Sequence, residues 1–159
     1  MSAPSGILVI GYGNTLRGDD GVGPRIAETI ERLRLPGVRT LVCQQLSPEY
    51  ADPVSRAAKV VFVDAAVDAP REVQLRPLLP GATSQLMAHS ADPRTMLALA
   101  RDVFGHAPEA WWLTVPVENL EFTEVLSPTA QRGLEIAVAE IRVICEARTT
   151  VKASPPPGP

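Results

Sequence analysis

The stretch from Ile7 to Gly23 limits the fold of this chain more than any other part of the sequence. It reads ILVIGYGNTLRGDDGVG: an apolar, β-branched run, a glycine-rich turn, and two adjacent acids, Asp19 and Asp20. An apolar run of this kind predicts a strand buried in a parallel sheet. Open α/β sheets bind their ligands beyond the carboxyl ends of the strands. The sequence therefore predicts a backbone that presents acid to a ligand at that edge.

A nucleotide is a poor fit for this turn. The dinucleotide fingerprint Gly-x-Gly-x-x-Gly needs a third glycine for close packing of helix and strand, but Gly11 and Gly13 are followed by Leu16 at that position. Asp19 and Asp20 would also repel a pyrophosphate unless a cation lay between them. A P-loop is excluded because no Gly-Lys-Ser/Thr follows the turn.

Composition favours one compact domain that does not bind nucleic acid. The chain has 159 residues, 45% of them hydrophobic, which is enough for one core and short for two. Its net charge is −3, and no basic stripe is visible. We expect a single domain over residues 1–150, a disordered proline-rich tail over residues 151–159, and a monomer.

The sequence also predicts a cytoplasmic protein without a membrane partner. No segment approaches the roughly 20 apolar residues that span a bilayer, and residues 1–6 lack the basic start of a secretory signal. Cys43 and Cys145 form no close pair, as is typical of a reduced protein.

Strand and helix patterns alternate along the chain. Strands are predicted at residues 7–11, 39–43, 59–66, 73–78 (an edge strand) and 111–115, and helices at residues 22–35, 47–56, 92–104 and from 127 onward. The predicted stripes place Val103 on the buried face of the third helix and Ser47 as the cap of the second. This alternation predicts an α/β fold, a three-layer sandwich with a mostly parallel twisted sheet of about five strands flanked by helices.

Three chemically useful residues fall where such a fold places its site. Asp20 follows the first strand, Asp64 ends the apolar run of the third, and His89 lies in the loop before the third helix. Two carboxylates and an imidazole suit nickel or zinc, and three ligands leave positions open for a substrate or water. Each residue alone also fits a helix cap, a turn or a polar loop, so only the combination favours a metal. The other histidine, His106, is predicted in a helix-terminating loop.

The sequence resembles the hydrogenase maturation proteases, the endopeptidases that trim the large subunit of nickel–iron hydrogenases. The resemblance rests on GYGNTLRGDDGVG and continues through VVFVDAAVD (residues 60–68), AHSADP (88–93) and LSP (126–128). It implies that Asp20, Asp64 and His89 bind metal, with Asp20 standing where many relatives carry glutamate. Asp19 is expected to be a capping or turn residue.

The resemblance further implies a metal-dependent, aspartic-type endopeptidase. Its substrate would be a hydrogenase large-subunit precursor that already holds nickel, and its product the precursor without the C-terminal extension. Asp20 and Asp64 would be the catalytic acids, and the nickel would be carried by the precursor rather than held by the free protein. Two alternatives remain open: a non-hydrolytic checkpoint that senses nickel in the same precursor, and a metal-dependent hydrolase with an unrelated substrate on the same fold.

Overall fold

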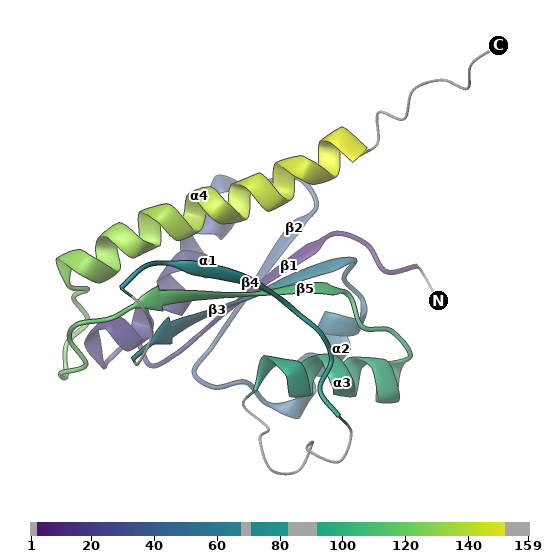
Figure 1. Cartoon of the computed structure of the whole chain (residues 1–159), viewed down its shortest axis with the longest axis horizontal. Coiled ribbons are helices and arrows are strands. Elements are labelled where there is room, and N and C mark those ends of the chain that lie inside the picture. The colour runs from purple at the N-terminus through teal and green to yellow at the C-terminus, as the bar shows by residue number, and fades with distance from the viewer. Residues whose placement is uncertain (1–2, 68–70, 83–91, 152–159) are drawn as a thin grey trace.

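A five-stranded, mostly parallel sheet forms the centre of the protein (Figure 1). The computed structural model describes residues 3–67, 71–82 and 92–151. The strand order is β2-β1-β3-β5-β4, in which only β4 runs antiparallel. The strands are β1 (Ile7–Tyr12), β2 (Val38–Cys43), β3 (Lys59–Ala66), β4 (Gln74–Leu78) and β5 (Glu109–Pro116).

Helices cover both faces of the sheet, as the sandwich prediction requires. One face packs against α1 (Val22–Leu33) and α4 (Pro128–Val151), and the other against α2 (Ala51–Ser55) and α3 (Pro93–Phe104). Two 3-10 turns, η1 (Gly18–Gly21) and η2 (Pro48–Tyr50), precede α1 and α2. The three-layer α/β prediction is confirmed.

The central strands are buried on both faces because their sequences are apolar without interruption. In β1, Ile7 and Val9 pack toward α1 and α4, whereas Leu8 and Ile10 pack toward α2 and α3. The same alternation places Val63 on the α1/α4 face and Phe62 on the α2/α3 face of β3. Because β1 and β3 pair in parallel, their C-terminal ends lie side by side at one edge of the sheet.

The start of α1 touches the strand backbone directly. A Cβ built on Gly11 would lie 2.1 Å from the Gly23 carbonyl oxygen, and one on Gly23 would lie 2.6 Å from the Val63 carbonyl oxygen. Any side chain at Gly23 would push the helix, and η1 before it, away from β1 and β3. This contact fixes the height of the GDDG turn above the strand ends.

Two details of the predicted helices are wrong. Val103 is 64% exposed, because the whole last turn of α3, residues 101–104, is exposed. Ser47 is the N-cap residue of η2, but its side chain accepts no hydrogen bond from a backbone amide there. Its hydroxyl turns toward the Glu49 side chain and donates to Glu49 Oε1 at 2.9 Å. The predicted cap at Asp92 is confirmed, because its side chain accepts from the Arg94 amide.

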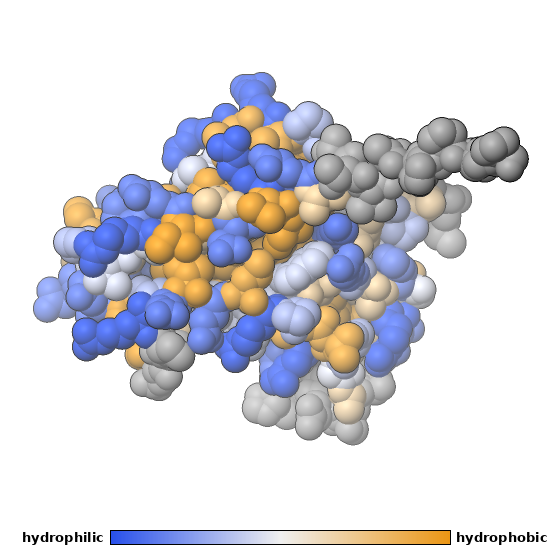
Figure 2. All heavy atoms as spheres, turned by 45° about the horizontal axis from the view of Figure 1, so that its top comes forward, coloured by the Kyte–Doolittle hydropathy of each residue, from blue (hydrophilic) through white to orange (hydrophobic). Residues whose placement is uncertain are grey.

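The outward side of α4 is mixed in character. Ile136 and Val143 are exposed on this helix among charged residues, and hydrophobic side chains gather near the middle of the face that Figure 2 presents. Among the described residues, none of the helices has the length and apolar content needed to cross a membrane. Residues 152–159 of the predicted tail lie outside the described residues.

Replacing Gly23 with alanine is expected to lower the free energy of unfolding by about 1–3 kcal/mol, because the added methyl group overpacks α1 against β1 and β3. Urea denaturation followed by circular dichroism measures the change. Gly81→Ala is the matched control, since the atom nearest to its Cβ lies at an ordinary 3.5 Å. Equal stability of the two variants would contradict the close helix–strand contact.

Candidate active site

Asp20 and Asp64 come together at the C-terminal edge of the sheet, as predicted. Asp64 lies near the end of β3, and Asp20 lies in η1, which follows β1, the strand paired with β3. The charge of Asp20 reaches Asp64 and contributes to the raised pKa of that carboxyl group. Both side chains are partly buried.

The environment of Asp64 suits a group that exchanges protons near neutral pH. Burial raises the pKa of Asp64 to about 6; the neighbouring Tyr12 hydroxyl and the Ala65 amide lower it, and the charge of Asp20 raises it further. A carboxyl group with a pKa near the working pH is an efficient general acid or base. Asp64 is therefore the residue here best suited to proton transfer.

Asp20 is held by the turn in which it lies. Its Oδ2 atom accepts a hydrogen bond from the Asn14 amide at 2.7 Å, and its own amide donates to the Arg17 carbonyl oxygen at 3.1 Å. The backbone of the turn therefore holds one oxygen of the Asp20 carboxylate, and the other oxygen accepts no hydrogen bond from the part of the chain that the structure describes.

Asp19 has a structural role, as the sequence indicated. It is fully buried and accepts hydrogen bonds from the amides of Glu118, Asn119 and Ser127 and from the Ser127 hydroxyl, at 2.6–3.0 Å. Burial alone would raise the pKa of Asp19, but these hydrogen bonds outweigh it, those of Ser127 first, and hold the pKa below its ordinary value. A carboxylate with this many donors has little capacity left for a ligand.

The Asp19 contacts tie the acidic turn to the return loop, residues 117–127, which joins β5 to α4. The Gly18 amide donates to the Thr123 carbonyl oxygen and the Asp19 amide to the Asn119 carbonyl oxygen, each at 2.8 Å. Ser127 also accepts a hydrogen bond from the Ala130 amide at 3.2 Å and so caps α4. Sequence reasoning did not predict this link, although the resemblance to the maturation proteases included the Leu126–Pro128 segment that contains Ser127.

His89, the third predicted ligand, lies outside the described residues, so its position near the two acids remains a prediction. The described chain resumes at Asp92, whose charge reaches Tyr12 at the end of β1. Within residues 3–67, 71–82 and 92–151, no group of three or more His, Cys, Asp or Glu side chains could hold a metal ion. His106 is not near the acids; its Nε2 atom contacts the Ala57 carbonyl oxygen at 3.3 Å.

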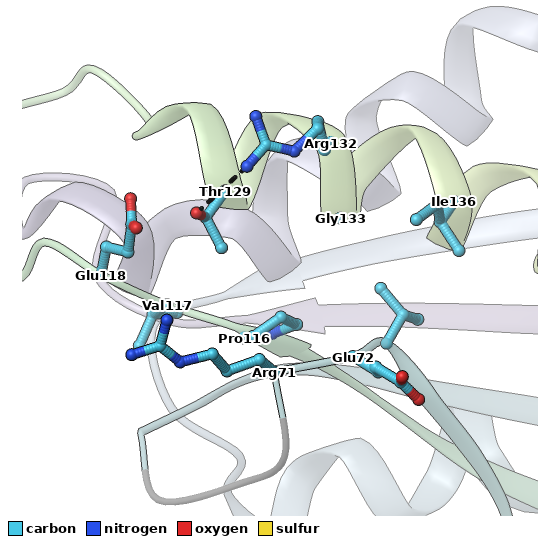
Figure 3. Close-up of a pocket in the computed structure, with 10 residues that line it drawn as sticks. Arg71, Glu72, Pro116, Val117, Glu118, Thr129, Arg132, Gly133 and Ile136 are labelled. Atoms are coloured by element: carbon cyan, nitrogen blue, oxygen red, sulfur yellow. Dashed lines mark hydrogen bonds between the residues drawn. The ribbon is translucent and has the colours of Figure 1, made fainter.

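A cleft of about 850 Å³ lies beside this site rather than in it (Figure 3). It runs between the start of α4 and the end of β5, with Arg132 on one wall and Arg71 on the other. It contains neither Asp20 nor Asp64. Glu118 links the cleft to the acidic turn, because it lines the cleft and its amide donates a hydrogen bond to Asp19.

Solved structures of the same fold are known. The chain matches the hydrogenase maturating endopeptidase HybD from E. coli with a TM-score of 0.71 and 22% identity, over 90% of this chain and 93% of that one. The fold is that of the hydrogenase maturation endopeptidases. HycI from Thermococcus kodakarensis matches with a TM-score of 0.68 and 20% identity over 89% and 92% of the two chains. HybD from the same organism matches with a TM-score of 0.66 and 20% identity, over 88% of this chain and 99% of that one.

No protein-family model and no curated protein sequence matches the chain. The likeness to HybD and HycI, at identities near 20%, therefore concerns the fold. It confirms the fold that the GYGNTLRGDDGVG resemblance implied.

Replacing Asp19 with asparagine is expected to lower the free energy of unfolding by at least about 2 kcal/mol, because the amide group of the new side chain points a donor at other buried donors. Asp52→Asn is the control. It removes only the exposed ion pair with Arg56 and is expected to cost less than about 1 kcal/mol. Urea denaturation compares the variants, and equal losses would contradict the role of Asp19.

The stabilisation from Asp19 is also expected to depend on pH. Because its pKa is lower in the folded than in the unfolded chain, its contribution is complete above the ordinary value of 3.8 and is lost as pH falls through the folded value. The stability difference between wild type and Asp19→Asn should therefore be constant from pH 5 to 7 and narrow below about pH 4. A difference that stays constant down to pH 3 would contradict this prediction.

Proposed function

We propose that this protein is a hydrogenase maturation endopeptidase that removes the C-terminal extension of a nickel-loaded hydrogenase large-subunit precursor. The observation that supports this best is the meeting of Asp20 and Asp64 at one edge of the sheet. The fold shared with HybD and HycI, which are named as maturation endopeptidases, is consistent with it. Fold alone would not suffice, because one fold hosts many activities.

The nickel in this proposal arrives with the substrate. One free oxygen of Asp20, the carboxylate of Asp64 and the imidazole of His89 would complete the coordination of the precursor's nickel and so hold the scissile peptide in register. Carboxylate and imidazole together suit a divalent metal of borderline character. A precursor without metal offers these residues nothing to bind, which makes metal loading the condition for cleavage.

Cleavage would be hydrolysis by an activated water. Asp64, once released from the metal, would take a proton from the water as the water oxygen attacks the scissile carbonyl carbon. The proton then passes to the departing amide nitrogen, the C–N bond breaks, and a new carboxylate and a free amine result. The substrate's metal would polarise the carbonyl oxygen.

We place this activity in the cytoplasm, with the precursor as partner and the enzyme as a monomer. Nickel would be needed only in the precursor, and the free enzyme would bind it weakly through its open positions.

Mass spectrometry of intact precursor tests the proposal. Wild-type protein is expected to remove one C-terminal peptide from nickel-loaded precursor and none from metal-free precursor. Asp64→Asn is expected to lower the rate at least about 100-fold because the amide cannot accept the proton. Asp20→Asn and His89→Ala are expected to abolish processing, and Asp52→Asn to leave it unchanged.

Three results would contradict the proposal in different ways. Unchanged mass with stable binding of loaded precursor would indicate the checkpoint. Equal cleavage of loaded and metal-free precursor would remove nickel from the recognition step. Full activity of Asp64→Asn would remove that residue from the chemistry.

A further inference from the structure

Three buried polar atoms near the proposed site lack a hydrogen-bond partner within the described residues: Tyr12 Oη, Trp112 Nε1 and Thr114 Oγ1. A buried polar group without a partner costs about 1–3 kcal/mol, and such a group in a folded protein calls for an explanation. All three belong to strands that surround the end of β3, and Thr114 is the β5 residue paired with Asp64.

Tyr12 and Asp64 are neighbours on adjacent strands. The last recorded pair between β1 and β3 joins Gly11 to Val63, so Tyr12 and Asp64 follow one residue later on both strands. Because side chains alternate along a strand, both point to the α2/α3 face, where Tyr12 packs with Leu8 and Ile10. Tyr12 is only 8% exposed.

The Tyr12 hydroxyl is a donor held next to an acceptor. Burial, together with the charge of the neighbouring Asp64, raises the pKa of Tyr12 far above its ordinary value, so the hydroxyl keeps its proton. In return, the hydroxyl lowers the pKa of Asp64. The two groups thus act on each other, although their geometry is not that of an ordinary hydrogen bond.

The Trp112 indole lies near the Tyr12 oxygen but makes no hydrogen bond to it. Asp64 is the acceptor beside the Tyr12 hydroxyl, so a carboxylate oxygen lies where the hydroxyl hydrogen can turn toward it.

We propose that Tyr12 is a positioning residue, whose hydroxyl holds one oxygen of Asp64 so that the other faces the substrate. This inference rests on the proposed function, because it gives Asp64 its role in the reaction. Hydrogen bonds of catalytic groups are commonly long in the free enzyme and shorten in the complex with substrate, which accounts for the loose contact seen here. Tyr12 touches no reacting atom; it acts through Asp64.

Kinetic comparison of Tyr12→Phe with Tyr50→Phe tests the proposal, since the chain has two tyrosines and both variants lose one hydroxyl. Tyr12→Phe is expected to lower kcat about 10- to 100-fold, the usual effect of removing a residue that orients a ligand, while KM stays within about twofold of wild type. Tyr50→Phe should change neither constant. Thermal unfolding checks that both variants fold.

Nuclear magnetic resonance of ¹³C-labelled tyrosine provides a second measurement that does not depend on cleavage. Tyr12→Phe identifies the Tyr12 signal, and Asp64→Asn is expected to shift that signal and not the signal of Tyr50. An unmoved Tyr12 signal would overturn the proposal whatever the kinetics. So would a Tyr12→Phe enzyme with wild-type kcat.

The two proposals fail in different ways. Wild-type protein that leaves the loaded precursor intact overturns the proposed function, and with it the positioning role, even where the tyrosine signal shows the contact. Wild-type protein that cleaves the precursor, with a Tyr12→Phe variant that cleaves it equally fast, overturns only the positioning role.

Discussion

The buried carboxylate of Asp19 is the contact on which the geometry of the site depends. It collects four hydrogen bonds from a loop about 100 residues further along the chain. These bonds fasten the acidic turn to the end of β5 and to the first turn of α4 at once. They add to the backbone hydrogen bonds that the Gly18 and Asp19 amides donate to the same loop, so η1 is held at this side as well as by β1 and α1. A buried contact far from the strand ends in sequence thus sets the position of the turn that carries Asp20.

Asp19 and Asp20 show how adjacent acids acquire different roles. The same residue type occurs at both positions, and only the surroundings differ. Asp19 is enclosed by donors that keep it charged and occupied. Asp20 receives one backbone amide in η1 and lies at the surface of the strand ends. The number of hydrogen-bond donors around each carboxylate, rather than the residue type, therefore distinguishes Asp19 from Asp20.

Much of the fold could be predicted from the sequence because its signals are local. The apolar runs of β1 and β3 predict buried parallel strands. An acid at the end of such a run is predicted to lie at the C-terminal edge of the sheet, and Asp64 does lie there. The Asp19–Ser127 link could not be predicted, since nothing in either segment identifies a partner 108 residues away. Tyr12 was missed for a smaller reason: the strand was predicted to end at Gly11, which assigned the tyrosine to the turn and hid its place next to Asp64 on the neighbouring strand. The exposure of Val103 could not be predicted either, because an apolar stripe indicates which side of a helix is buried but not at which turn burial stops.

The electrostatics of the two acids bear on why metal loading would control cleavage. Burial, and to a smaller extent the charge of Asp20, raises the pKa of Asp64, so keeping this carboxyl group charged costs free energy. A divalent cation carried by the substrate reverses that cost, because each carboxylate then faces opposite charge. A precursor without metal brings no such compensation. Under the proposed function, discrimination between the two precursors thus follows from the cost of keeping a buried carboxylate charged, which only the metal-loaded precursor offsets.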